Sequence, residues 1–142
     1  MTTEDELTAL LHSLEETLKS LQRSLYALRD SQRDHLLADL INRQGPLWLA
    51  GLDLIRANLS YADLSEAILI STNLERANLE GANLPRANLS GANLRHARLR
   101  GADLSEANLS GSDLSGADLE GVRGLEKATL KDTIMPNGSR HA

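Results

Sequence analysis

The sequence predicts a mainly β solenoid, in which short extended segments alternate with corners, preceded by a long N-terminal α-helix. Leucine recurs at every fifth position from Leu54 to Leu119 without a miss. A small residue, usually alanine, stands two positions before each of these leucines except Leu54, which Leu52 precedes. Residues 4–44 lack this period and carry leucines at helical spacing instead. Internal repetition of this kind is the signature of a solenoid, in which neighbouring repeats share one core.

The N-terminal segment reads as a helix with a signal at each end. Thr3 and Glu6 have the spacing of a capping box, and Gly45–Pro46 is a typical stop, since proline cannot continue a helix. Between these signals, leucines separated alternately by four and three residues predict a coiled-coil seam. The seam residues are Leu7, Leu11, Leu14, Leu18, Leu21, Leu25 and Leu28.

The second half of this segment has a different apolar stripe, which lies on a helix face rotated relative to the seam. One interpretation is that the helix breaks near Ser31. We expect residues 32–44 to pack over the N-terminal coil of the solenoid as a cap. The cap residues are Leu36, Leu37, Leu40 and Ile41. A continuous helix of this length would span about 60 Å, more than its own solenoid. The seam therefore predicts a homo-oligomer through the N-terminal helix; a heterologous partner or a folded-back hairpin is the alternative.

A period of five fits neither an α-helix nor a strand. Steps of five would carry the leucines around every face of a helix, and would alternate them between the two faces of a strand. A period of five is possible when each repeat is one short extended side plus a corner. Leucine and the small residue two positions before it then both point inward. Asn or Asp stands between them at 12 of the 14 positions before Leu54 through Leu119. We expect these residues, including Asp53, Asp63 and Asp103, at the corners, because their side chains hydrogen-bond nearby amides.

The pattern Ala-(Asn/Asp)-Leu-x-x, as in Ala57-Asn58-Leu59-Ser60-Tyr61, resembles the pentapeptide-repeat proteins over residues 47–134. The resemblance implies a right-handed four-sided parallel β-helix with four pentapeptides in each 20-residue coil, and so about four to five coils. The phase slips by one residue at Gly124, which predicts a distorted final coil. The implied organisation is a helix over 1–45, the β-helix over 46–134 and a tail over 135–142. The stretch Thr133-Ile-Met-Pro-Asn-Gly138 resembles endings common in cyanobacterial members.

Composition excludes several functions. The chain has no cysteine, so disulfides, thiolate metal sites and cysteine nucleophiles are excluded. The net charge of −5 is the wrong sign for a nucleic-acid binder. An acidic start and no run of about 18 apolar residues predict a cytoplasmic protein without a membrane segment.

The sequence offers no arrangement of residues for catalysis. Its four histidines stand far apart, at positions 12, 35, 96 and 141, with no metal-ligand spacing between them. The glycines at the repeat corners keep the five-residue phase and do not form a phosphate loop. We therefore expect no catalytic residue, no cofactor and no metal ion, and infer that the protein is not an enzyme.

Two binding functions fit these observations. The first is a scaffold or adaptor that presents rigid β-helix faces to a protein partner. The alternative comes from the resemblance: some family members mimic DNA and bind type II topoisomerases such as gyrase. Those rods are strongly acidic, whereas residues 47–134 here hold 12 acids against nine bases, so the scaffold is preferred.

Stacking by 20 residues assembles the expected interaction surface. Trp48, Ile68 and Ile70 would cluster at the N-terminal end of one face, and exposed apolar clusters usually mark contacts. Arg56, Arg76 and His96 would form a basic column. The candidate interaction residues are Trp48, Ile55, Tyr61, Ile68, Ile70, Arg76, Arg95, His96, Arg98 and Arg100.

Overall fold

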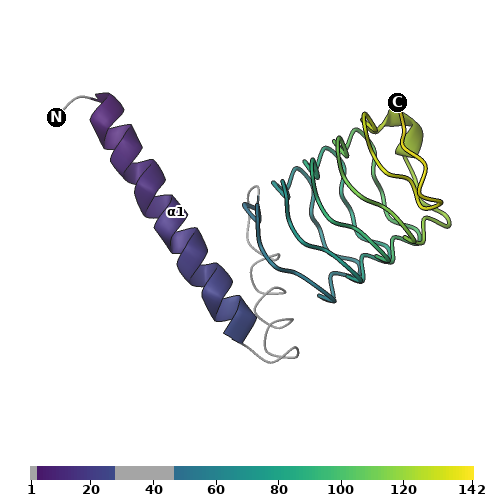
Figure 1. The fold of residues 1–142 in the computed structure, drawn as a ribbon, viewed down its shortest axis with the longest axis horizontal. Coiled ribbons are helices and arrows are strands. Elements are labelled where there is room, and N and C mark those ends of the chain that lie inside the picture. The colour runs from purple at the N-terminus through teal and green to yellow at the C-terminus, as the bar shows by residue number, and fades with distance from the viewer. Residues whose placement is uncertain (1–2, 28–46) are drawn as a thin grey trace.

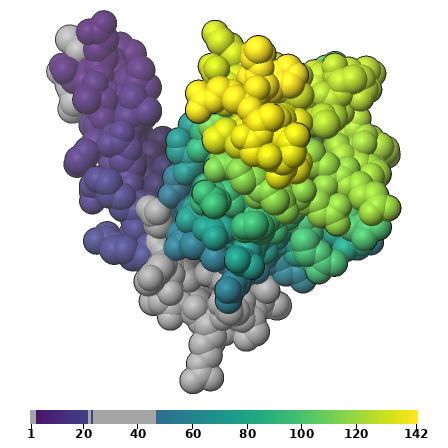
Figure 2. All heavy atoms as spheres, turned by 45° about the vertical axis from the view of Figure 1, so that its right-hand side comes forward, coloured from purple at the N-terminus to yellow at the C-terminus, as the bar shows by residue number. Residues whose placement is uncertain are grey.

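The computed structural model describes residues 3–27 and 47–142 of the 142-residue chain. It consists of the helix α1 (Thr3–Ala27), a β-helix and a short 3-10 helix, η1 (Leu125–Lys127), near its far end. Figure 1 shows α1 running past the N-terminal end of the β-helix, and Leu21 near the end of α1 packs against the β-helix core. The two parts also contact each other in the space-filling view of Figure 2.

Helix α1 contains the first part of the predicted seam. Its described part begins at Thr3, and residues 1–2 lie outside the described residues, so the capping box of Thr3 and Glu6 stays a prediction. Glu4, Asp5 and Glu6 lie in the first turn, where carboxylates interact favourably with the helix dipole. Among the described residues, no helix is long and apolar enough to cross a membrane.

Several predictions for the N-terminal segment lie outside the described residues. They are the break near Ser31, the packing of residues 32–44 over the first coil, and the stop at Gly45–Pro46. The residues concerned are Leu28, Leu36, Leu37, Leu40 and Ile41.

The β-helix is held together by parallel β-bridges between residues 20 apart. Trp48 bridges Ile68, which bridges Asn88, and three further columns repeat this pattern on the other sides. The backbone hydrogen bonds are uniform: the N–H of Leu54 donates to the carbonyl of Asn73 at 2.7 Å, and the same bond recurs around each coil. Each bridge is isolated, and no longer strand forms within residues 47–142, because the chain turns after every five residues.

The predicted core is confirmed in nearly every repeat. The leucines from Leu49 to Leu114 are buried, as are most of the small residues two positions before them. Leu119 is only half-buried, and so is Ala62, which corrects the expectation that every inward position is closed. Where threonine replaces alanine, its hydroxyl is satisfied: Thr72 Oγ1 donates to the carbonyl of Leu49 at 2.8 Å.

The position expected for Asn and Asp was wrong. These residues occupy the middle of each side, where they form the β-bridges, and the corner is made by the two residues after the leucine. The predicted hydrogen bonding is nevertheless present, since Asp53 Oδ1 accepts from the N–H of Ile55 at 3.2 Å. The side chain therefore stabilises the start of the corner from the side before it.

The repeat changes at its C-terminal end. The bridged spacing lengthens from 20 to 21 residues, because Asn108 pairs with Thr129 and not with residue 128. Gly124 (φ +78°) and η1 accommodate the extra residue. Beyond it the chain folds back, and Ile134 forms an antiparallel bridge with Arg140. The final residues thus pair with the edge of the last coil.

Candidate interaction surfaces

Each corner of the β-helix carries a column of outward-pointing residues, one from every coil. The second residue of the corner has a positive φ, such as 58° at Arg56, and its N–H bonds the next coil. Glycine adopts this conformation without strain, and other residues here are held in it by the bonds between coils. The four columns are Gly51, Ser71, Gly91 and Gly111; Arg56, Arg76, His96 and Gly116; Tyr61, Gly81, Gly101 and Gly121; and Glu66, Arg86 and Glu106.

The predicted apolar cluster lies at the N-terminal end of one face. Trp48 is 66% exposed and bridges the half-buried Ile68, while Ile70 is 38% exposed beside the column headed by Gly51. We call Trp48, Ile68 and Ile70 the apolar patch. Further along the same columns stand small or polar residues, so the patch is confined to the first two coils. Ile55 is half-buried on a different corner and does not belong to it.

The basic column contains Arg56, Arg76 and His96, as expected from the 20-residue stacking. Arg76 is only 4.0 Å from Glu75, and Arg56 forms no ion pair with another described residue. The His96 ring lies over Gly116, in the space that a side chain at that glycine would fill. Arg95, in the adjoining column, is 3.8 Å from Asp113.

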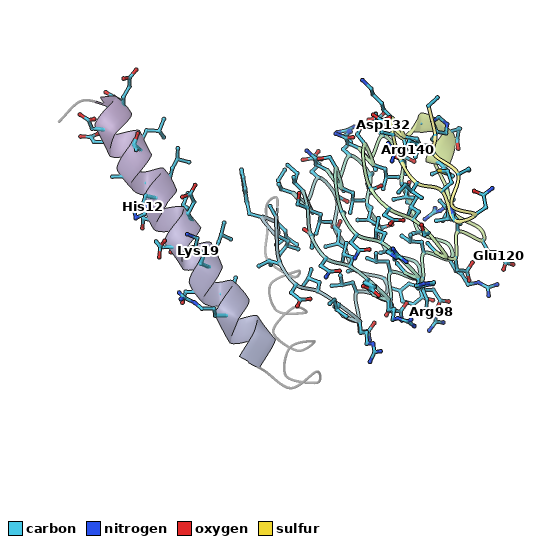
Figure 3. All side chains as sticks on the ribbon, viewed as in Figure 1. His12, Lys19, Arg98, Glu120, Asp132 and Arg140 are labelled. Atoms are coloured by element: carbon cyan, nitrogen blue, oxygen red, sulfur yellow. The ribbon has the colours of Figure 1, made fainter. Side chains whose placement is uncertain are left out.

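Arg98, on the following side, and Arg100, at the next corner, are paired with acids of neighbouring coils. Arg98 lies 3.3 Å from Glu80, and Arg100 lies 2.8 Å from Glu120. Figure 3 shows Arg98 and Glu120 projecting from the same side of the β-helix. Such exposed pairs contribute little to stability, but they neutralise the charge of the surface.

One corner carries an alternating ladder of charges. Arg86 sits between Glu66 and Glu106, 3.3 Å and 3.1 Å away, each one coil distant. The hydrogen bond and the charge of Glu106, followed by those of Glu66, raise the pKa of Arg86 above its ordinary value. The three side chains therefore form one ion network along the rod.

Three of the aspartates on the sides, Asp63, Asp103 and Asp113, accept hydrogen bonds from the serine two positions later. Ser105 donates to Asp103 Oδ1 from its hydroxyl and from its N–H, at 2.6 Å and 2.9 Å. These two hydrogen bonds hold the pKa of Asp103 below its ordinary value, and those of Ser65 do the same for the pKa of Asp63. Both carboxylates are thus ionised and engaged in the fold.

A shallow groove that the sequence analysis missed runs along the glycine corner. Its floor is formed by glycines from three successive coils, and Tyr61, 73% exposed, closes its N-terminal end. The Tyr61 ring lies over Gly81, where a side chain would collide with it. The lining residues are Tyr61, Glu80, Gly81, Arg100, Gly101, Glu120 and Gly121. The sequence signal that could have predicted this groove is the 20-residue spacing of Tyr61 and the three glycines, which stacks them in one column.

Helix α1 presents the other large apolar surface. Leu7, Leu10, Leu11 and Leu14 are each more than half exposed, whereas Leu18 and Leu21 are half-buried. The side chain of Leu25 lies outside the described residues, so the seam is characterised only from Leu7 to Leu21.

No metal-binding cluster appears among the described side chains: no three His, Asp or Glu residues converge in a way that would hold an ion. His12 lies on α1 and His96 on the β-helix, and His141 is at the C-terminal end.

Comparisons with known proteins give a consistent result. A family model described as pentapeptide repeats matches residues 49–86 and 87–123, with eight copies. A pentapeptide repeat protein from the thylakoid lumen of Arabidopsis thaliana is 37% identical, with a TM-score of 0.59, and the match covers 61% of this chain and 59% of that one. This chain thus spans less than two thirds of the length of that protein.

Two cyanobacterial structures are similar to the same degree. A pentapeptide repeat protein from Cyanothece 51142 is 40% identical over 66% of this chain and 67% of its own, with a TM-score of 0.58. Another, from Nostoc PCC 7120, is 35% identical over 62% of this chain and 72% of its own, also with a TM-score of 0.58. No curated protein matches the chain.

Proposed function

Because the chain belongs to the pentapeptide-repeat family and its coils are joined by regular β-bridges, we propose that it is a non-enzymatic scaffold or adaptor. The β-helix presents fixed outward columns to a protein partner, and α1 joins the rod to another protein or to a second copy. The cytoplasmic location stays a prediction, since one similar structure is that of a thylakoid-lumen protein.

The observation that carries this proposal is the exposure of large apolar side chains on a rod with a fixed backbone. Trp48 and Tyr61 are 66% and 73% exposed, and Ile70 adds a third apolar side chain to the surface. The bridges between coils hold these residues in place, so a partner would meet a preorganised surface. Binding to such a surface avoids the entropy cost of ordering it.

The DNA-mimic alternative receives less support from the charge pattern. A phosphate mimic needs continuous negative columns, but Arg86 separates Glu66 from Glu106, and Arg100 pairs with Glu120. A gyrase supercoiling assay tests the alternative directly. Inhibition that rises with the dose of this protein would replace the scaffold proposal with the mimic.

The scaffold proposal is tested by partner capture with variants of the apolar patch. The full chain is immobilised, and bound proteins are recovered from host cells. We expect Ile68→Asp with Ile70→Asp to lose the partner, because charges replace the apolar contact. The matched control, Asn88→Asp with Ser90→Asp, introduces the same two aspartates one coil further along the same columns, where no apolar contact is lost, and should retain the partner.

A second variant tests whether the basic residues contribute. Arg95→Glu with Arg98→Glu reverses two charges on the rod without touching the core. If the partner is acidic, this variant should bind it more weakly, and added salt should weaken wild-type binding as well. If neither patch variant nor charge variant loses the recovered partner, the rod is not the binding surface.

A further inference from the structure

The N-terminal half of α1 carries an apolar stripe that its own chain leaves open. Leu7, Leu10, Leu11 and Leu14 are 57%, 62%, 52% and 59% exposed and follow one another at helical spacing. Leu21 lies on the same side of the helix as Leu7 and Leu14, since seven residues make almost two turns, and it packs against the β-helix core. Figure 1 shows α1 diverging from the β-helix toward its N-terminus, the half of the helix in which these leucines are exposed.

We propose that this stripe pairs with α1 of a second copy of the chain, and that the two helices run antiparallel. This inference rests on the proposed function, in which α1 joins the rod to another molecule, and it names that molecule and the arrangement. In an antiparallel pair the two seam positions of the heptad face each other. Leu7 then faces Leu18 of the second copy, and Leu11 faces Leu14 of the second copy.

The charges along α1 favour the antiparallel arrangement. Residues 3–16 contain five acidic residues and no Lys or Arg, whereas residues 17–27 contain Lys19 and Arg23 and no acid. A parallel pair would place the two acidic first turns, Glu4–Glu6, side by side. The antiparallel pair separates the two acidic turns, brings the basic C-terminal half of each helix toward the acidic turn of the other, and opposes the helix dipoles.

The position of the β-helix points to the same arrangement. Leu21 holds the C-terminal half of α1 against its own rod. A parallel pair would therefore bring both rods to the same end of the helix pair, where they would compete for space. In the antiparallel pair the rods lie at opposite ends, and a two-fold axis relates the copies, which closes the assembly as a dimer.

The stripe is small compared with the interface of a permanent dimer. Four half-exposed leucines from each chain bury less than the roughly 1,200–2,000 Å² of a typical stable complex. The dimer should therefore dissociate on dilution, with a dissociation constant in about the micromolar range. At high concentration the mass should approach twice the 15.4 kDa of one chain.

Cysteine crosslinking tests the orientation, because the chain has no cysteine of its own. Leu7→Cys and Leu18→Cys are made as separate full-length proteins and oxidised alone and as a mixture. We expect the crosslinked dimer only in the mixture, since these positions are about 16 Å apart along one helix and face each other only when antiparallel. Crosslinking of each protein with itself would show a parallel pair and overturn the proposal.

A second measurement tests self-association without crosslinking. Leu11→Asp should reduce the mass in light scattering to that of one chain, whereas Ala9→Asp, on the opposite side of α1, should leave the dimer intact. Wild-type protein that stays at 15.4 kDa at high concentration, with no crosslink in the mixture, would overturn the pairing. Capture of a partner by the apolar patch is measured independently, so that result would leave the scaffold proposal standing.

Discussion

Replacing Leu84 with alanine tests whether the repeated leucines form one continuous packed core. Leu84 is fully buried, with Leu64 one coil before it and Leu104 one coil after it, both also fully buried. Its backbone is fixed from both directions, because its N–H donates to the carbonyl of Asp103 at 2.8 Å and its carbonyl accepts from the N–H of Ala87 at 3.1 Å. The coils therefore have little freedom to collapse into the space that the substitution leaves.

The magnitude follows from this rigidity. A buried Leu→Ala substitution costs about 2–5 kcal/mol, and the cost rises with the cavity that remains. We expect Leu84→Ala to lower the free energy of unfolding by about 3–5 kcal/mol, because the bridges between coils keep the cavity open. Leu84→Asp should prevent folding altogether, since it places an unpaired charge in the core.

The assay is urea unfolding followed by circular dichroism, at concentrations too low for the α1 pair to form, with the exposed Leu14→Ala as the matched control. Leu14 is 59% exposed on α1, so the same chemical change there should alter the unfolding of the rod by less than about 0.5 kcal/mol. Equal effects at the two positions would refute the reasoning. So would a Leu84→Asp protein that is soluble and has an unchanged spectrum.

Three further predictions concern the joints of the rod. Gly124→Ala should destabilise it more than Gly111→Ala in the same unfolding assay. A Cβ at Gly124 would lie 2.5 Å from the backbone nitrogen of Ser105, whereas at Gly111 no atom lies within 4 Å and the positive φ opposes the substitution, at about 1–2 kcal/mol. Equal losses would contradict this. Because the pKa of Asp103 is lower in the folded protein than in the unfolded chain, this carboxylate stabilises the fold above its unfolded pKa, and the contribution is lost as the pH falls through the lower folded value. Ser105→Ala should therefore reduce the drop in the urea midpoint between neutral and acidic pH. An unchanged drop would show that the Ser105–Asp103 hydrogen bond does not contribute to the pH dependence. Arg86→Gln should cause a small loss of stability at low salt that shrinks as salt is added, and a loss independent of salt would mean that its ion pairs do not contribute.

The inward half of each repeat was predictable from the sequence because it has only one physical solution. Leucine at every fifth position, with alanine two before it, leaves a single way to bury both residues, and the structure confirms it from Leu49 to Leu114. The exception at Leu119 occurs where the following coil changes its spacing. The same periodicity correctly placed Trp48 above Ile68, since stacking by 20 residues follows from the four-sided coil.

The position of Asn and Asp could not be read from the same pattern. Their hydrogen bonding to the backbone two residues later was anticipated, and Asp53 makes this bond with Ile55. The propensity of Asn and Asp for turns suggested that they occupy the corner. Their side chains instead accept a hydrogen bond from the residue two positions later, so they stand on the side that precedes the corner. The turn propensity of Asn and Asp thus predicts the hydrogen bond to the backbone, but the fold determines where in the repeat these residues stand.

The amino-acid sequence alone specifies the repeating core, its phase and the columns that stack on each side, because burial of the leucines admits one arrangement. The tertiary structure decides which charges neutralise each other and what remains exposed. Arg86 meets two glutamates from separate coils, and Tyr61 lies over Gly81, through contacts between residues 20 apart that depend on side-chain conformation. The packing of Leu21 on the rod, with four leucines left open on α1, likewise depends on how the helix meets the β-helix, which a local spacing pattern does not contain.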